Sequence, residues 1–363
     1  MSDFEGLRIA LIGPLPPPAG GMANQMLSLV ENLQGGKAVV RVVRSNAPYR
    51  PRWVGRLPVV RAAFRLVPYL ISLRRAARQS EICHVLANSG WAWHLFVTPA
   101  IWVTSMYRVP VVVHYHGGEA STFLARSVRW VRWSMPRVRQ LIVPSGYLKD
   151  VFSGFGMQAR VIPNLVDLDR FFPADRGPND SPHIVVARNL EAVYDNETAV
   201  RAFATLVKRW PIARLTLAGT GPDRAHLEAV VRELRLELQV TFAGRLDRDA
   251  MAALFRSADL CLNPSRVDNM PVSILEAMAS GVPVVSTNVG GIPYMAQDGR
   301  TALLVEPGDP IAMATASELM LCDAPLRARI VAAALEAVSA YSWRQSSPLW
   351  LAIYRNALVA GSA

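Results

Sequence analysis

Short apolar runs alternate with longer amphipathic segments along the whole chain. In the first half the apolar runs lie at 9–12, 39–43, 82–86, 111–115 and 141–144. In the second half they lie at 184–187, 214–218, 240–242, 260–263, 284–286 and 302–305. Runs that are short and apolar throughout are typical of strands buried on both faces of a parallel sheet. The alternation therefore predicts two doubly wound α/β domains.

A stretch rich in Pro, Gly and charge separates the two halves. Residues 173–182 read PADRGPNDSP, which is typical of a linker. We expect a first domain over 1–172, a second over 183–340, and a terminal helix within 341–363. A length of 363 residues suits two domains. Ligands of such folds bind beyond the carboxyl ends of the strands, so we expect a site in the cleft between the domains.

The cysteines and the apolar segments predict a cytoplasmic protein. Cys83, Cys261 and Cys322 are widely spaced in apolar stretches, which indicates buried, reduced thiols. The first apolar run follows acidic residues rather than the basic region of a secretory signal. Residues 91–107 are apolar but short for a bilayer span and contain a proline, so we expect a buried crossover helix there.

Positive charge is concentrated in the first half of the chain. The net charge is +11, and residues 1–170 carry 21 Lys and Arg against 8 Asp and Glu, which is +13 and leaves −2 for the rest. Arginines alternate with Trp, Phe and Leu in two tracts, 50–78 and 123–139. A solvated face remains an alternative, but this mixture favours peripheral docking on an anionic membrane surface, at its inner face. Nucleic acid is an unlikely partner because no recognised binding motif accompanies the charge.

The block at 263–287, NPSRVDNMPVSILEAMASGVPVVST, carries the most informative chemistry. It places Asp268 and Glu276 on either side of a strand-to-helix turn, with a helix predicted over 272–279. Backbone amides at a helix start attract phosphate or sugar oxygens, and carboxylates accept hydrogen bonds from hydroxyls. The block therefore predicts half of a site for a nucleotide sugar.

This block resembles the donor-binding signature of family 4 of the retaining glycosyltransferases, which have the GT-B fold. The signature is an acid, seven intervening residues, Glu, an Ala-Met-Ala helix, Gly and a Pro-Val-Val strand; here Glu276 is the second acid, but Asp268 replaces the usual first Glu. The resemblance implies two Rossmann-like domains that face each other across a cleft, and a terminal helix within 341–363 that crosses back to the first domain. It also implies that Glu276 binds the donor, typically its ribose, while Asp268 and the backbone amides of the following loop hold the sugar. The loop residues are Asn269, Met270 and Pro271.

Two glycine-rich turns in the first half add candidates. Gly20 and Gly21 follow the first strand, where a backbone without side chains allows close approach of a ligand. His116 precedes a glycine pair in VVVHYHGGE, and the resemblance implies that it reaches the sugar from the first domain. We expect His114 and His116 to point in opposite directions, which disfavours a shared metal. Asp167 and Asp169 are assigned to turns and caps rather than to a metal.

Arg188 follows the first strand of the second domain and can clamp phosphate oxygens with its planar fork. The resemblance expects a Lys five or six residues later, where this chain has Val193 and Tyr194. Tyr194, Asn196 or a base elsewhere is expected to take the place of the missing charge.

Together with these features, the resemblance implies a retaining glycosyltransferase that is metal-independent and has no cofactor. The donor would be a nucleotide diphosphate sugar and the acceptor a glycan or a lipid-linked molecule, in cell-surface or exopolysaccharide synthesis. Two alternatives remain open. One is a nucleotide-sugar epimerase of the same fold, and the other is a noncatalytic binder of membranes or nucleic acid.

Overall fold

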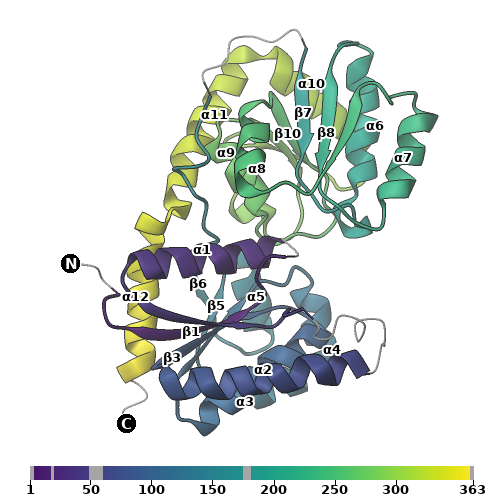
Figure 1. The fold of residues 1–363 in the computed structure, drawn as a ribbon. Helices are drawn as coiled ribbons and strands as arrows, with labels where there is room; N and C mark the ends of the chain where they lie inside the picture. Colours follow the sequence, from purple (N-terminus) through teal and green to yellow (C-terminus); the bar gives the residue numbers. More distant parts are fainter. Residues whose placement is uncertain (1–3, 18–19, 49–59, 175–180, 360–363) are drawn as a thin grey trace. The chain divides into compact units, whose positions relative to one another are not determined.

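The computed structural model describes residues 4–17, 20–48, 60–174 and 181–359, with side chains from residue 64 onward in the third range (Figure 1). The chain forms two compact units. Unit 1 comprises Met1–Asn164 and Ser346–Ala363, and unit 2 comprises Leu165–Gln345. The change of unit therefore falls after residue 164, whereas the sequence placed it after 172, and most of the predicted linker lies outside the described residues.

Unit 1 contains a six-stranded, wholly parallel sheet in the order β2-β1-β3-β4-β5-β6. The strands are β1 (Arg8–Gly13), β2 (Val39–Arg44), β3 (Ile82–Ala87), β4 (Val111–Tyr115), β5 (Val138–Val143) and β6 (Arg160–Val161). The sequence missed β6, because both of its residues are exposed and give no apolar signal. It also began β5 three residues too late, since Arg139 lies among the first, partly exposed positions of that strand.

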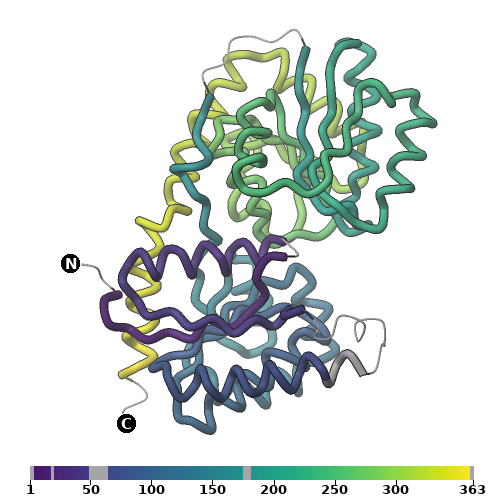
Figure 2. The backbone as a smooth tube through the Cα atoms, in the orientation of Figure 1, coloured from purple at the N-terminus to yellow at the C-terminus, as the bar shows by residue number. Residues whose placement is uncertain are grey.

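Helices cover both faces of this sheet. They are α1 (Gly21–Gly35), α2 (Val60–Gln79), the π-helical turn η2 (Trp93–Val97), α3 (Thr98–Met106), α4 (Ala120–Ser134), the turn η3 (Met135–Arg137), α5 (Gly146–Gly154) and α12 (Trp343–Val359). One face packs against α2, η2, α3, α4 and α5. The other carries α1 and α12, and α12 returns to unit 1 after the whole of unit 2, as the tube in Figure 2 shows.

The predicted crossover helix is present as η2 and α3, with Trp93, Ala100 and Ile101 fully buried in the core of unit 1. Over the described residues, no helix combines the length and the apolar character needed to cross a bilayer. All three cysteines are free thiols. Cys83 and Cys261 are buried as predicted, but the prediction is wrong for Cys322, which lies exposed at the end of its helix.

Unit 2 contains a second six-stranded parallel sheet, in the order β12-β11-β10-β7-β8-β9. The strands are β7 (His183–Val186), β8 (Arg214–Ala218), β9 (Val240–Gly244), β10 (Leu260–Asn263), β11 (Val284–Thr287) and β12 (Leu303–Val305). The helices and turns are η4 (Ala192–Tyr194), α6 (Asn196–Val207), α7 (Arg224–Glu233), α8 (Arg248–Arg256), α9 (Val272–Ala279), η5 (Ile292–Tyr294), α10 (Pro310–Cys322), α11 (Ala324–Val338) and η6 (Ser339–Tyr341). Separate apolar clusters fill the two faces of the sheet, one under α8, α9 and α11 and one under α6, α7 and α10. The prediction of two doubly wound α/β domains is confirmed.

Candidate active site

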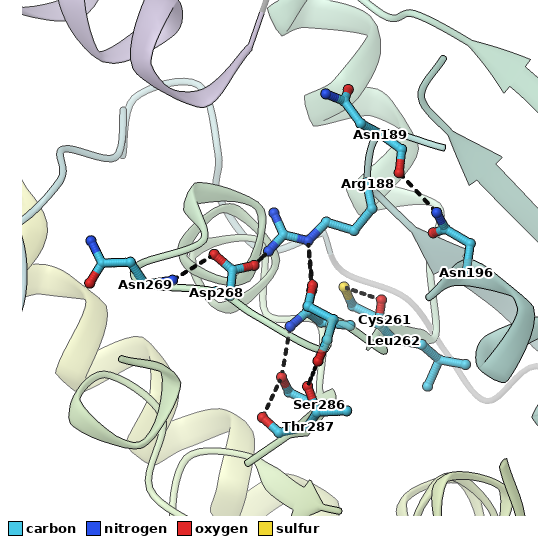
Figure 3. A network of polar contacts seen from close by, with 11 residues as sticks. Arg188, Asn189, Asn196, Cys261, Leu262, Asp268, Asn269, Ser286 and Thr287 are labelled. Atoms are coloured by element: carbon cyan, nitrogen blue, oxygen red, sulfur yellow. Dashed lines mark hydrogen bonds and ion pairs between the residues drawn. The ribbon is translucent and has the colours of Figure 1, made fainter. Parts of the chain in front are cut away.

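Arg188 follows β7 and its guanidinium is held in place by residues from the β10 end of the same sheet (Figure 3). Its Nε donates to Asn263 Oδ1 at 2.7 Å and to Ser265 Oγ at 3.2 Å. Its Nη2 forms an ion pair with Asp268, and the two side chains are only 12% and 13% exposed. Burial lowers the pKa of Arg188 to about 10, so the group remains charged at neutral pH.

A polar network behind Arg188 fixes its acceptors. Asn263 Nδ2 donates to Ser286 Oγ at 2.9 Å, and Ser265 Oγ donates to Asn263 Oδ1 at 3.0 Å. Thr287 Oγ1 donates to the Ser265 backbone oxygen at 2.6 Å. Each of these side chains is buried, where an unpaired polar group would be costly. The network therefore turns the Asn263 oxygen toward Arg188, a role that the sequence did not reveal.

Asp268 uses both carboxylate oxygens within the protein. One pairs with Arg188, and the other accepts the Asn269 backbone N–H at 2.9 Å. The predicted contact of Asp268 with a sugar stays a prediction, and a ligand would meet this carboxylate already paired. Among the three loop residues proposed to donate backbone hydrogen bonds to the sugar, Pro271 has no N–H, and the N–H of Asn269 is already donated to Asp268.

Glu276 lies on α9, whose bounds agree with the predicted helix. Ile274, Leu275 and Met278 anchor that helix in the core, which leaves Glu276 half-buried. Burial raises the pKa of Glu276 to about 7, against the opposing charges of Arg248 and Arg188. Glu276 is thus close enough to Arg188 for their charges to interact, and unit 2 brings Arg188, Asp268 and Glu276 together.

Glycines allow the loops of this site to approach one another. A Cβ at Gly219 would lie 2.0 Å from the Arg188 backbone oxygen, and one at Gly290 would lie 2.0 Å from the Asp268 backbone oxygen. Gly221 and Gly291 make equally close approaches to Leu190 and Asn269. The pair at 290–291 was missed, because its only signal in the sequence is two adjacent glycines after a buried strand.

The remaining candidates, His116 and the glycines at 20–21, lie in unit 1. His116 follows β4 and its backbone N–H donates to the Ala87 oxygen at 2.9 Å. Burial lowers the pKa of its imidazole to about 4, although a hydrogen bond with Asn164 opposes the shift. Within the described residues the His116 Nε2 is buried and has no hydrogen-bond partner.

The prediction that His114 and His116 point in opposite directions is wrong. Their ring centroids lie 4.0 Å apart, because side chains alternate along a strand and residues two apart share a face. His84 on β3 joins the same cluster, with a centroid distance of 5.5 Å to His114. No group of three His, Cys, Asp or Glu among the described residues is arranged to hold a metal ion.

Gly20 and Gly21 begin α1, as N-cap and first residue. No described atom lies within 4 Å of a Cβ built at either position, so the backbone there borders open space. Asp167 accepts the Arg170 backbone N–H at 3.3 Å and pairs with its side chain at 3.2 Å, a turn role in agreement with the prediction.

Comparison with known proteins identifies the family. The family model described as Glycosyltransferase Family 4 matches residues 19–170, and the one described as Glycosyl transferases group 1 matches residues 181–323. A glycogen synthase of Mycobacterium tuberculosis is 30% identical over 274 residues, which are 72% of this chain and 66% of that protein. A sulfoquinovosyl transferase of Arabidopsis thaliana is 26% identical over 94% of this chain and 72% of its own length. The chain thus spans about two thirds of the length of these curated relatives.

Solved structures agree on the fold. Sucrose-phosphate synthase from Thermosynechococcus elongatus superposes with a TM-score of 0.77 at 22% identity, over 98% of this chain and 100% of that one. Anabaena HepE, solved in complex with UDP and glucose, gives a TM-score of 0.73 at 17% identity, with the same coverage. Because the two family models match consecutive parts of the chain and the solved structures share both Rossmann-like domains, the protein belongs to family 4 of the glycosyltransferases, enzymes with the GT-B fold.

Proposed function

We propose that the protein is a retaining glycosyltransferase that moves a sugar from a nucleotide diphosphate sugar to a glycan or a lipid-linked acceptor, without a metal ion or a cofactor. The observation that carries this proposal is the largely buried Arg188 at the strand ends of unit 2, which is paired with Asp268 and interacts through its charge with Glu276. A positioned guanidinium stabilises the negative charge that grows on the departing diphosphate. An acceptor from cell-surface or exopolysaccharide synthesis would suit the positively charged surface of unit 1.

The other candidates have distinct roles in this proposal. Glu276 accepts hydrogen bonds from donor hydroxyls, typically those of the ribose. Asp268 and the loop of Asn269 and Met270 hold the sugar in this proposal. His116 contributes its unpartnered Nε2 to the sugar, and the open backbone at Gly20 and Gly21 gives room for a ligand.

A donor screen tests the proposal. Thermal unfolding with UDP-, GDP- and ADP-sugars should show stabilisation by one nucleotide class, amounting to about 2.7 kcal/mol at a hundredfold excess over Kd. Glu276→Ala should remove charge-assisted hydrogen bonds of about 1.5 to 3 kcal/mol each and weaken binding by about tenfold or more. No stabilisation by any of these donors would instead favour a noncatalytic binder.

Turnover separates a transferase from an epimerase. With oligosaccharide or short-chain lipid phosphate acceptors, a transferase should release nucleoside diphosphate in proportion to a glycosylated product. NMR should show that the anomeric configuration of the donor is retained in that product. Conversion of the donor sugar without any acceptor would support the epimerase and reject the transferase.

We also propose that unit 1 docks on an anionic membrane surface. Helix α4 exposes Trp130 and Trp133, at 65% and 53%, beside Arg126 and Arg129. Helix α3, which contacts both α2 and α4, adds Trp102, whose ring stacks 4.3 Å from Trp133. On α2 the exposed apolar side chains are Phe64, Val67 and Ile71, and the basic residues before position 64 lie outside the described side chains. Arginine with tryptophan on neighbouring helices suits a lipid headgroup layer.

Vesicle sedimentation tests this docking. Retention is expected on anionic but not on neutral vesicles, and it should weaken as salt rises. Replacing Arg126, Arg129 and Trp130 with serine should reduce retention, since each basic residue near the surface contributes about 1 kcal/mol. A matched control replaces Arg232 and Arg329, two exposed arginines of unit 2. Equal binding to neutral vesicles, or equal losses in both variants, would reject electrostatic docking through α4.

A further inference from the structure

The guanidinium of Arg188 is restrained on one face as well as along its edges. The Tyr194 ring lies over it, with 4.8 Å between Arg188 Cζ and the ring centroid. Asn263 and Ser265 hold the Nε edge, and Asp268 holds Nη2. Among the described residues, none forms a hydrogen bond or an ion pair with the other terminal nitrogen, Nη1.

Tyr194 is itself fixed by a short turn that is hydrogen-bonded to a neighbouring loop. Its backbone N–H donates to the Glu191 oxygen at 2.9 Å, which closes η4. Arg266, from the loop that also carries Asp268, donates its backbone N–H to the Val193 oxygen at 2.9 Å. The Arg266 Nε donates to Asp195 Oδ2 at 3.0 Å. The turn that presents the ring and the loop that presents the carboxylate are therefore joined on both sides of Tyr194.

The Tyr194 ring and the Nε contacts together give Arg188 an orientation that its ion pair alone would not. A guanidinium paired with a carboxylate favours the bidentate arrangement, in which two of its nitrogens face the two oxygens. That arrangement would turn further N–H groups toward Asp268 and away from any ligand. The Nε contacts with Asn263 and Ser265 oppose this in-plane rotation. The aromatic face keeps the whole guanidinium from swinging away, because the cation is attracted to the ring only while the two stay close.

We propose that Tyr194 is a positioning residue, which together with Asp268 holds Arg188 so that Nη1 is presented to a phosphate oxygen of the donor. This inference rests on the proposed function and deepens it. The family resemblance predicts a second positively charged residue at this turn. This chain has Tyr194 there instead, and its ring orients Arg188. The diphosphate would then be recognised by a single fixed positive charge at this point, and the strength of that contact would depend on the ring.

Two substitutions separate the ring face from the rest of the side chain. Tyr194→Phe keeps the face and removes the hydroxyl, whereas Tyr194→Leu keeps the bulk and removes the face. Calorimetry would measure the affinity of each for UDP, GDP and ADP and for the matching nucleosides. We expect Tyr194→Leu to bind the preferred nucleoside diphosphate about 3- to 30-fold more weakly, the loss that corresponds to a cation–π contact. Nucleoside affinity should be unchanged, and Tyr194→Phe should stay within about twofold of the parent.

Measurements of kcat and KM for the donor add a test that a purely structural role of Tyr194 would not affect. Negative charge on the departing phosphate is greater in the transition state than in the bound donor. Tyr194→Leu should therefore lower kcat as well as raise KM for the donor, whereas both should stay near the parent values in Tyr194→Phe. Unchanged diphosphate affinity in Tyr194→Leu would overturn the inference, as would an equal loss for nucleoside and diphosphate. A Tyr194→Phe variant as weak as Tyr194→Leu would assign the effect to the hydroxyl and also overturn it. A parent protein that binds none of the three diphosphates would reject the proposed function, and this inference with it.

Discussion

A residue that is suited to binding a ligand can lower the stability of the fold, and Glu276 is the example in this site. Glu276 is a half-buried carboxylate whose pKa burial raises to about 7 from an ordinary 4.5. The charged form that would bind hydroxyls is therefore disfavoured by the fold in the absence of a donor. Arg248 and Arg188 offset part of that cost, because their charges favour the carboxylate.

Glu276→Gln should be more stable than the parent at pH 8 while binding the donor less tightly. A carboxyl whose folded pKa is raised binds its proton more tightly when folded, so its contribution to stability declines as pH rises from about 4.5 to 7. Glutamine has no such decline, and its advantage should grow over the same window and then level off. Urea unfolding at pH 5, 6, 7 and 8 measures this, with the exposed Glu237→Gln as control. A stability difference that does not vary with pH would contradict the assignment.

At the scale of elements, helix α12 closes a cluster of buried imidazoles on the sheet of unit 1. Tyr354 Oη lies 2.8 Å from His84 Nδ1 in a hydrogen bond, and the Trp350 ring lies 5.1 Å from that of His114. Burial lowers the pKa of His84 to about 3 and that of His116 to about 4, and it lowers the pKa of His114 well below its usual range. The cluster is therefore neutral in the folded protein.

This cluster should make unit 1 sensitive to acid. Imidazoles whose folded pKa is depressed take up protons in the unfolded chain near pH 6.5 but not in the folded one. Stability should be fully present above about pH 6.5 and be lost progressively as pH falls toward 4. His114→Phe should reduce the slope of melting temperature against pH between 7 and 5. The exposed His226→Phe is the control, and equal slopes in the parent and His114→Phe would refute the idea.

Elements with an uninterrupted apolar pattern were predictable, whereas long-range pairing was not. The predicted ranges for β4, β8, β10 and α9 agree with the structure, because each is a buried run ended by glycine, proline or polar residues. Arg188 was found as a site residue, but its pairing with Asp268 joins positions eighty residues apart that no local pattern connects. The same holds for the glycines at 290–291, whose importance lies in backbone from another loop.

At the scale of the whole molecule, the proposed donor contacts of Arg188, Asp268 and Glu276 belong to unit 2, whereas Gly20, Gly21 and His116 belong to unit 1. Unit 2 has its own sheet and apolar clusters on both faces of it. We therefore expect residues 165–345, produced alone, to fold cooperatively and to bind the same nucleoside diphosphate as the full chain.

Residues 1–164 alone should fail to fold stably, since they lack Trp350 and Tyr354 over the histidine cluster. Circular dichroism melts and calorimetry on the two fragments measure both expectations. A cooperative melt of 1–164 equal to that of unit 1 in the full chain would show that α12 adds little. If fragment 165–345 folds but binds no diphosphate, some of the donor contacts must lie in unit 1.

The return of α12 to unit 1 sets an order of events during synthesis. Translation proceeds at about 5–20 residues per second, so roughly 10 to 40 s pass between the emergence of residue 164 and that of the helix that covers His84 and His114. Unit 2 is complete before unit 1 is. The first half of the nascent chain therefore keeps an apolar surface exposed during this time. A chaperone that shields such surfaces has its longest opportunity to bind there.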